Sequence, residues 1–252
     1  MSLHSRNPVG RFDDRAADYV KYRPGYPRES IDAILEGLPA ASSLRAADIG
    51  AGTGISARLL GERGVHVMAI EPGAAMRNAA APHPNVRWLA ARAEATGLLN
   101  GSVDIVVCAQ SFHWFQPDAA IAEFARILRA GGRLAIIWNR RSQTDPLTRG
   151  YRDALIEVGG EAEIERMPFD PSCITRNGSF GAPVRRVALS GQTVNLDGLI
   201  GRALSASYAP KSGPEGERLL SLLRDLHARY ADTNGDVRLV YDTELFLATR
   251  MG

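Results

Sequence analysis

The sequence is poor in the residues on which several classes of protein depend. Its 252 residues include two cysteines, Cys108 in an apolar run and Cys173 in a polar stretch, and this contrast predicts no disulfide between them. It has no CxxC pair and no HExxH motif, and its five histidines are scattered. A dedicated metal site therefore has no support, and we expect any catalysis to proceed without a metal.

Long apolar runs and concentrated charge are also missing. The apolar runs, such as Val103 to Ala109, are much shorter than a membrane span, and Met1 to Arg11 has no apolar stretch that could serve as a signal peptide. The 30 basic and 28 acidic residues nearly cancel, and no basic run reaches five residues. We therefore expect a cytoplasmic protein with neither a membrane nor a nucleic acid as its partner.

A regular alternation of apolar runs and helical stretches occupies the middle of the chain. Gly, Pro or Asn follows each apolar run, and continuous hydrophobicity is typical of parallel strands covered on both faces. This pattern predicts a doubly wound α/β fold. The five expected strands are Ala46 to Ile49, Val65 to Ile70, Val86 to Ala90, Val103 to Ala109 and Arg133 to Trp138.

The flanking sequence is expected to add a cap and two further strands, which makes a Rossmann-like sheet of seven strands. Strands near Val187 to Val194 and Thr243 to Thr249 would form an antiparallel edge. The helical cap would come from the N-terminus and from an insert after the fifth strand. The expected divisions are an N-terminal lid and first helix (1–44), a nucleotide-binding core (45–139), a cap insert (140–183) and a C-terminal part completing the sheet (184–252).

The strongest motif is the glycine loop from Asp48 to Gly54, which follows the first expected strand. Its glycines allow a sharp turn and a close approach to a ligand, which a β-carbon would prevent. A dinucleotide fingerprint, GxGxxG, would place its third glycine at position 55, which is Ile55. The second expected strand ends at Glu71, whose carboxylate could accept hydrogen bonds from both hydroxyls of a ribose.

The glycine spacing favours S-adenosylmethionine (SAM) over NAD as the ligand. An NAD-dependent oxidoreductase is further disfavoured because the only lysines, Lys21 and Lys211, complete no Tyr-x-x-x-Lys pair. In the alternative, the loop binds no ligand and is only a turn between a strand and a helix, and Glu71 is a solvated residue at the end of a strand. For Asp48 two roles remain open, since it could cap backbone amides of the loop or hold the ammonium group of a ligand.

In order along the chain, several segments resemble class I SAM-dependent methyltransferases of the type 11 domain, in the small-molecule branch that includes trans-aconitate methyltransferase-like proteins. These segments are FDDRAADYVKYRPGYP, DIGAGTG, EPGAAM, AEA, SVDIVVCAQSFHWF, LRAGGRLAIIWN and, more weakly, SASY and TELFLATR. The resemblance covers nearly the whole chain. It departs at Ala130, where the family usually has proline, and after Ala95, where the usual proline is missing.

The resemblance implies a set of cofactor contacts. The amino-acid end of SAM would lie against Asp48, Gly50, Ala51 and Gly52, and Glu71 would hold the ribose. The adenine would lie among Pro72, Met76, Ala93 and Glu94, and Gln110 would close the site at the end of the fourth strand. From the residues alone, Met76 could instead be a core residue and Glu94 an exposed loop acid. The position of Gln110 at the carboxyl edge of the sheet favours ligand contact.

Methyl transfer mainly requires alignment of the acceptor and exclusion of water, so a catalytic residue is not obligatory. The strongest candidate for a general base is His113, just past the fourth strand, and it would be needed only for a hydroxyl or amine acceptor. The alternative is a structural histidine bound to a neighbouring loop. Trp114 could stack beside the methionine portion of SAM or simply pack.

A group of aromatic residues and one arginine precedes the turn at Pro24 and resembles the family's lid. Arg23 could pair with the carboxylate of SAM, while Tyr22 covers the cofactor and Tyr19 contacts the acceptor. The alternative is a solvated arginine beside tyrosines that pack on the first helix.

We expect the acceptor to be a small organic molecule, and an anionic one. Arg140 and Arg141 directly follow the fifth expected strand, where guanidinium groups could bind a carboxylate. They could equally be solvated, with Asp145 neutralising one of them. The rival function is a SAM-binding protein without catalysis. The sequence determines neither the identity of the acceptor nor the oligomeric state.

Overall fold

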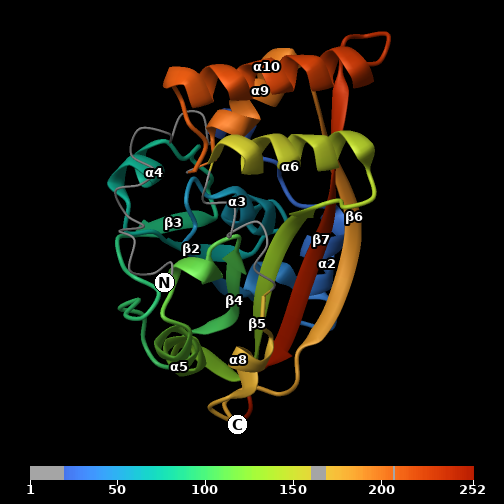
Figure 1. Cartoon of the computed structure of the whole chain (residues 1–252). Coiled ribbons are helices and arrows are strands. Elements are labelled where there is room, and N and C mark those ends of the chain that lie inside the picture. Colours follow the sequence, from blue (N-terminus) through green and yellow to red (C-terminus); the bar gives the residue numbers. More distant parts are fainter. Residues whose placement is uncertain (1–19, 160–168, 207) are drawn as a thin grey trace.

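The computed structural model describes residues 20–159, 169–206 and 208–252, and it confirms the predicted seven-stranded doubly wound sheet (Figure 1). The strand order is β3-β2-β1-β4-β5-β7-β6. The first five strands are parallel, and β7 is antiparallel to both β5 and β6. The strands are β1 (Arg45–Ile49), β2 (His66–Ile70), β3 (Val86–Leu89), β4 (Val103–Ala109), β5 (Leu128–Arg141), β6 (Val184–Val194) and β7 (Val237–Thr249).

Helices cover both faces of the sheet, as continuous apolar strands require. The helices are α2 (Arg28–Leu35), η3 (Ala41–Ser43), α3 (Ile55–Gly61), α4 (Ala74–Asn78), η4 (Phe112–Trp114), α5 (Pro117–Ile127), α6 (Pro146–Gly159), α8 (Ser172–Thr175), α9 (Leu196–Leu204) and α10 (Gly213–Tyr230). No helix in the described ranges is both long and apolar enough to cross a membrane.

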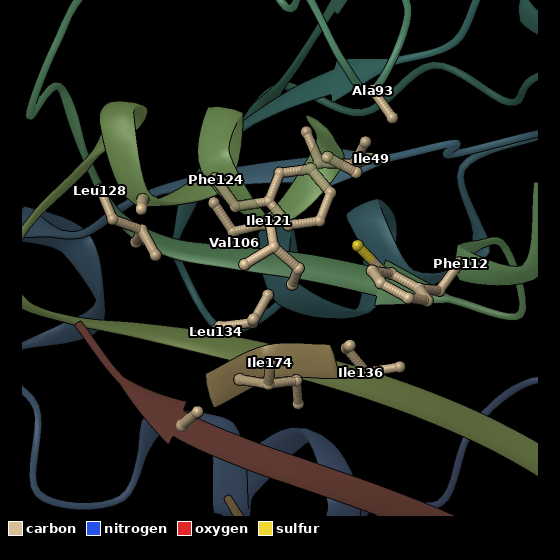
Figure 2. Close-up of a cluster of buried hydrophobic side chains, with 14 of the residues drawn as sticks. Ile49, Ala93, Val106, Phe112, Ile121, Phe124, Leu128, Leu134, Ile136 and Ile174 are labelled. Carbon is tan, nitrogen blue, oxygen red and sulfur yellow. The ribbon is translucent and has the colours of Figure 1, made fainter. Parts of the chain in front are cut away.

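Two buried layers hold these helices to the sheet. On one face, α2 and α3 contribute Ile31, Ile34 and Leu60 to a cluster with the inward residues of β1, β2 and β4. On the other face, α5 and α8 pack through Phe124 and Ile174 against β4 and β5 (Figure 2). Each fully buried Ile, Leu or Phe stabilises the fold by roughly 1.5–3 kcal/mol, so these layers fix the sheet on which the site is built.

The cap contains helices from two parts of the chain. The insert supplies α6, and α9 and α10 come from 184–252, where the sequence pattern predicts helices near Leu196 to Ala206 and Glu217 to Arg229. The three helices share an apolar cluster with the first residues of β7, centred on Tyr151 and Leu223. Figure 1 shows them as a layer above the sheet, whereas α8 lies at the opposite end beside α5. The apolar faces of α9 and α10 decide this arrangement, because each must be buried against another element.

The strand order reverses at β1, which has β2 on one side and β4 on the other. Ligands of open α/β sheets bind beyond the carboxyl ends of the strands at such a reversal. The loops after β1, β2, β4 and β5 therefore meet at the edge of the sheet that faces the cap.

Candidate functional site

A cavity of about 830 Å³ lies between the carboxyl edge of the sheet and the cap. Its volume falls in the range of roughly 300–1,000 Å³ that is usual for small-ligand sites. The loops after β1, β2, β3, β4 and β5 all contribute lining residues, and so do α6 and α9. Most of the expected site residues therefore share one space, although they come from distant parts of the sequence.

The glycine loop after β1 has the backbone geometry that its sequence predicts. Gly50, Gly52 and Gly54 have φ values of 66°, 57° and 76°, a left-handed region that other residues rarely adopt. The Gly50 and Ala51 amides donate hydrogen bonds of 2.8 and 3.1 Å to the carbonyl of Ile70, which ties the loop to the end of β2. A β-carbon on Gly50 would lie 2.7 Å from Cβ of Ser111, so this position accepts only glycine without a local shift.

Glu71 is held beside this loop by backbone amides. Its Oε2 accepts a 2.9 Å hydrogen bond from the Gly52 amide, and its Oε1 accepts one of 2.8 Å from the Gly73 amide. Burial raises the pKa of the carboxyl above its ordinary value, and the two amides partly counter this rise. Each oxygen keeps a second lone pair, so the carboxylate is oriented at the cavity wall and can still accept hydrogen bonds from a ligand.

Asp48 lies behind the loop and is not a lining residue of the cavity. It is fully buried, and its Oδ2 accepts a 2.6 Å hydrogen bond from Ser56 Oγ. Its other oxygen, Oδ1, has no hydrogen-bond partner within the described part of the chain. Burial raises the pKa of this carboxyl to about 7, although the Ser56 hydroxyl and the Ala57 amide lower it. These contacts join Asp48 to the first turn of α3 and not to an amide of the glycine loop, and Oδ1 keeps lone pairs that could still accept from an ammonium group.

Asp48→Asn should change how stability depends on pH. Between pH 3.8, the ordinary pKa, and about 7, the folded protein holds a proton on Asp48 that the unfolded chain has released. Stability from this group is therefore greatest below the ordinary pKa and is lost as the pH rises through about 7. In urea unfolding, the free energy of unfolding of Asp48→Asn minus that of the parent should be larger at about pH 8 than at about pH 5, by a few kcal/mol at most. An equal difference at both pH values would mean that Asp48 titrates normally.

The expected adenine contacts lie together along one wall. Pro72, Met76, Ala93 and Glu94 all line the cavity, with Met76 only 6% exposed. Met76 therefore belongs both to the core and to the cavity wall. Glu94 is not a free loop acid, because its Oε1 accepts a 2.9 Å hydrogen bond from the Gln116 amide at the start of α5.

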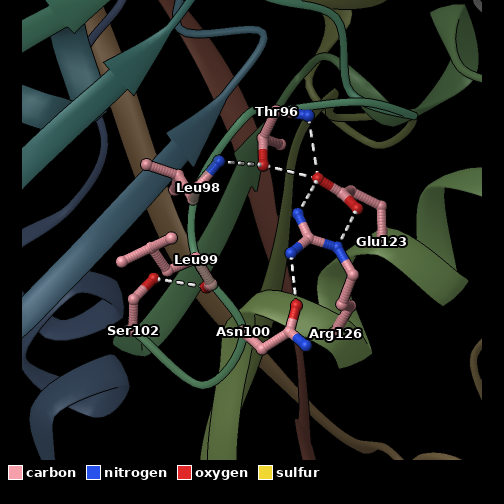
Figure 3. Close-up of polar contacts among 7 residues, drawn as sticks. All are labelled: Thr96, Leu98, Leu99, Asn100, Ser102, Glu123 and Arg126. Carbon is pink, nitrogen blue, oxygen red and sulfur yellow. Dashed lines mark hydrogen bonds and ion pairs between the residues drawn. The ribbon is translucent and has the colours of Figure 1, made fainter.

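The loop that carries Ala93 and Glu94 is fixed by a buried carboxylate on α5. Glu123 accepts hydrogen bonds from the amide and hydroxyl of Thr96, at 2.8 and 2.5 Å, and pairs with Arg126 through both of its oxygens (Figure 3). Burial raises the pKa of Glu123, but the bonds from Arg126 and Thr96 outweigh it and leave the pKa below its ordinary value. Glu123 was not selected from the sequence, because its role depends on a partner 27 residues away.

Gln110, which directly follows β4, has a strained backbone conformation. Its φ of 56° is the one positive value at a non-glycine residue in the described ranges, and such strain is concentrated at functional sites. Its side chain lines the cavity and donates a 3.1 Å hydrogen bond to the Asn139 carbonyl. Asn139 Nδ2 in turn donates one of 3.0 Å to the Gly25 carbonyl, which anchors the N-terminal turn to the end of β5. The backbone strain was not visible in the sequence.

Aromatic rings form the wall beyond Gln110. His113 lies in η4 and lines the cavity, with its ring 4.7 Å from that of Trp114 and 5.3 Å from that of Trp138. Phe169 continues the wall at 6.0 Å from Trp138. Trp138 and Phe169 were not selected from the sequence. The arrangement gives a largely apolar space with one imidazole at its edge, which can orient an acceptor and exclude water.

Some residues of the N-terminal segment line the cavity, and others pack against the cap. Tyr19 and the residues before it lie outside the described residues. Tyr22 does not line the cavity, and its ring packs at Gly201 on α9, where an added β-carbon would lie 2.3 Å from Tyr22 Cε2. Tyr26 lines the cavity in its place, as does Arg23, whose Nη2 donates a 3.1 Å hydrogen bond to the Ser205 carbonyl.

The two arginines after β5 have different surroundings. Arg140 lines the cavity, but its Nε donates a 2.5 Å hydrogen bond to Glu244, which also pairs with Arg185 at 2.6 Å. Within the part of the chain that the structure describes, Arg140 therefore pairs with Glu244 on β7 and not with Asp145. Arg141 is only 5% exposed, and its guanidinium stacks 5.0 Å from the centre of the Tyr151 ring. Neither arginine is a simply solvated residue.

The cavity fits SAM by chemistry and by size. Gly50 allows close approach to the backbone, Glu71 presents oriented carboxylate oxygens, and Asp48 has a buried oxygen without a hydrogen-bond partner among the described residues. No group of three or more potential metal ligands occurs in the described ranges. The cavity continues from this cofactor end to the aromatic wall and to Arg202 on α9, which leaves space for a second small molecule.

Comparisons with known proteins agree with this geometry. Residues 47–136 match the family described as methyltransferase domain. An uncharacterized methyltransferase of Mycobacterium tuberculosis is 43% identical over 144 residues, and the match covers 57% of this chain and 58% of that protein. Malonyl-[acyl-carrier protein] O-methyltransferase of Enterobacter lignolyticus is 24% identical over 94% of both chains. A solved structure of a candidate type II methyltransferase from Anaeromyxobacter dehalogenans aligns with a TM-score of 0.70 at 25% identity, over 91% of this chain and 99% of that one.

Proposed function

We propose that this protein transfers a methyl group from SAM to a small organic acceptor. Residues 47–136 match the methyltransferase domain family, and the sheet has the fold of a solved methyltransferase structure. The accepting atom is an oxygen or a nitrogen. The observation that carries the proposal is the single cavity that joins the glycine loop and Glu71 to the aromatic wall around His113.

We assign the cofactor end of the cavity as follows. The backbone of Gly50, Ala51 and Gly52 receives the amino-acid part of SAM, Glu71 accepts hydrogen bonds from the ribose hydroxyls, and Arg23 pairs with the carboxylate. Pro72, Met76, Ala93 and Glu94 surround the adenine, with Gln110 and Trp114 beside the methionine part. Asp48 acts from behind the loop, and Tyr22 supports the N-terminal segment through its contact with α9.

His113 is the proposed general base for a hydroxyl or amine acceptor. Bound SAM supplies a methyl group on a positively charged sulfur, which an acceptor can displace directly. His113 lies on the acceptor side of Gln110, between Trp114 and Trp138. These rings keep the imidazole in place at the edge of an apolar space, where it can take the proton that the acceptor loses.

Support for a small anionic acceptor comes from two observations. The cavity is enclosed by helices of the cap and has a volume suited to a cofactor and one compact molecule. The relative from Enterobacter lignolyticus is named as an O-methyltransferase of malonyl-[acyl-carrier protein]; its malonyl group carries a carboxylate, which supports the negative charge of the acceptor and not its small size. Arg140 and Arg141 both line the cavity, and Arg140 pairs with Glu244.

The rival function, SAM binding without catalysis, would not require a space for an acceptor. The wall of His113, Trp138 and Phe169 extends the cavity beyond the cofactor residues, and this extension favours the enzyme. NAD binding is disfavoured because Ile55, in place of the third glycine of that fingerprint, begins α3.

The central test is the choice of cofactor. In isothermal titration calorimetry, SAM and its product S-adenosylhomocysteine should bind, and NAD should give no heat. Tight binding of NAD, together with no heat and no thermal shift from SAM at millimolar concentration, would overturn the proposed function.

Glu71→Ala should weaken SAM binding by roughly tenfold or more. Each charge-assisted hydrogen bond to the ribose contributes about 1.5–3 kcal/mol, and the variant also leaves the Gly52 and Gly73 amides without their acceptor. Glu62→Ala is the matched control, since Glu62 is an exposed acid just after α3 and does not line the cavity. If a folded Glu71→Ala protein and the control bind SAM equally well, Glu71 lies outside the site.

A further inference from the structure

Asn139, near the end of β5, forms hydrogen bonds to three other parts of the protein and was not selected from the sequence. Its backbone carbonyl accepts a 3.1 Å hydrogen bond from Gln110 Nε2, and its side-chain Nδ2 donates one of 3.0 Å to the carbonyl of Gly25. Its side-chain Oδ1 accepts one of 2.7 Å from the hydroxyl of Thr243 on β7. Asn139 and Gln110 both line the cavity. One residue therefore joins the end of β4, β7 and the N-terminal turn at the cavity wall.

The N-terminal turn, Arg23 to Pro27, forms neither helix nor strand, although Arg23 and Tyr26 both line the cavity. Gly25, between them, is exposed and has no side chain to anchor it. Nothing lies within 4 Å of the position that a β-carbon would take there, so the tip of the turn faces open space on that side. Within the described residues, the bond from Asn139 is the only hydrogen bond that Gly25 makes. The position of the tip therefore depends on Asn139.

The orientation of the Asn139 amide is set from the far edge of the sheet. The Gly25 carbonyl can only accept a hydrogen bond, so the amide nitrogen must face it and the amide oxygen must face Thr243. The Thr243 hydroxyl then donates to that oxygen, and the hydroxyl of Ser190 on β6, 3.0 Å away, can donate to Thr243 in turn. Thr243 is fully buried, so water does not compete for these bonds. Three side chains in a row thus present a fixed donor to the turn.

Gln110 connects the same residue to the cofactor end of the cavity. Its backbone amide donates a 2.9 Å hydrogen bond to the Ile137 carbonyl, and its side chain binds the Asn139 carbonyl two residues further along β5. These two bonds hold the backbone of Gln110 at its strained φ of 56°. A displacement of Asn139 would therefore affect both Gln110 and the N-terminal turn.

We propose that Asn139 is a positioning residue, which holds the N-terminal turn and Gln110 in the observed geometry and so sets how fast the cofactor enters and leaves. The inference rests on the proposed function, because it takes SAM and S-adenosylhomocysteine as the molecules that the cavity binds. The turn that carries Arg23 and Tyr26 must move aside for an enclosed cofactor to leave. The bond to Gly25 opposes this movement in the empty and in the occupied protein alike. It therefore slows both association and dissociation and changes the affinity little.

The first test is Asn139→Asp, with S-adenosylhomocysteine binding followed by stopped-flow fluorescence of Trp114 and Trp138, which line the cavity. The aspartate still accepts from Thr243, but it turns an oxygen, in place of a donor, towards the Gly25 carbonyl. The association and dissociation rates should both rise about fivefold or more, as loss of one hydrogen bond predicts, and the dissociation constant should stay within about twofold of the parent value. A lower melting temperature with unchanged rates would make Asn139 a structural residue only and would contradict the proposal.

Asn85→Asp controls for the chemical change itself. Asn85 Nδ2 donates a 3.0 Å hydrogen bond to the Gly61 carbonyl, so this variant loses the same kind of bond. Asn85 directly precedes β3 and does not line the cavity, so both rates should equal those of the parent. Equal rates in Asn139→Asp and Asn85→Asp would overturn the proposal.

Two substitutions at Thr243 test the positioning while Asn139 itself is unchanged, and they serve also if Asn139→Asp does not fold. Thr243→Val keeps the shape of the side chain but removes the hydroxyl that orients the amide, so both rates should rise. Thr243→Ser keeps the hydroxyl and should retain the rates of the parent. Equal rates in the valine and serine variants would show that the hydroxyl does not matter, which contradicts the proposal.

Hydrogen–deuterium exchange of the protein without cofactor gives a measurement that does not depend on the proposed function. The backbone amides of residues 21–26 should exchange about fivefold faster in Asn139→Asp and Thr243→Val than in the parent, and at the parent rate in Asn85→Asp. Unchanged exchange in this segment would overturn the positioning role of Asn139. Failure of the parent to bind S-adenosylhomocysteine would instead overturn the proposed function.

Discussion

Gly50→Ala should reduce the affinity for SAM by about a hundredfold or more. An alanine at a φ of 66° costs about 1–2 kcal/mol in backbone strain, and its β-carbon would lie 2.7 Å from Cβ of Ser111 and 3.0 Å from Cζ of Phe115. Ser111 cannot move away freely, because its hydroxyl donates a 2.7 Å hydrogen bond to the Ile49 carbonyl at the end of β1. The loop must therefore shift, and calorimetry with SAM measures the consequence.

Gly37→Ala is the matched control, because it introduces the same kind of backbone strain without crowding a neighbouring side chain. Gly37 has a φ of 74°, but nothing lies within 4 Å of the position its β-carbon would take. The Gly37→Ala variant should lose about as much stability in urea unfolding as Gly50→Ala does, and it should keep the affinity of the parent for SAM. If Gly50→Ala binds SAM as tightly as Gly37→Ala does, close packing of the loop against Ser111 does not shape the cofactor site.

His113→Gln should lower kcat by at least about a hundredfold with the preferred hydroxyl or amine acceptor, and leave the affinity for SAM unchanged. Glutamine keeps a similar size and can still form hydrogen bonds between Trp114 and Trp138, but it cannot accept a proton at neutral pH. The variant should also lose the fall in kcat at low pH that a protonated histidine causes in the parent.

The matched control for this prediction is His66→Gln. His66 is exposed at the start of β2 and does not line the cavity, so kcat should remain at the parent value. Equal turnover by His113→Gln and the parent, with the same pH profile, would assign His113 a structural role. The reacting group of the acceptor would then be already ionised, as a carboxylate is.

Local patterns were sufficient for the parallel core because its interactions are local or repeat regularly. Strands covered on both faces must be continuously apolar, so β4 was predicted at its observed bounds. The β5 strand begins earlier, at Leu128, because Val103 on β4 pairs with it across a register shift. The glycine loop was predicted for a similar reason, since left-handed backbone geometry requires glycine whatever the partner.

Local patterns were insufficient where a role depends on a distant partner. Arg140 and Arg141 are adjacent in sequence, but side chains alternate along a strand, so Arg140 meets Glu244 while Arg141 stacks on Tyr151. Tyr22 and Tyr26 both looked like covering residues, and only Gly201 on α9 accounts for the ring of Tyr22 turning away from the cavity. Neither the contacts of the two arginines nor the orientation of Tyr22 can be predicted from the few residues that flank each side chain.

The sequence by itself determined the sheet, the glycine loop and the position of Glu71 at the end of a strand, because the period of apolar residues and the backbone freedom of glycine act within a few residues. Only the tertiary structure decided which side chains line the far end of the cavity. It brought α9, from the C-terminal part, over the end of β5, and so placed Arg202 beside Arg141 in one cavity. The physical reason is that burial of apolar helix faces is non-directional, so it fixes which side chains meet only once all the elements have packed together.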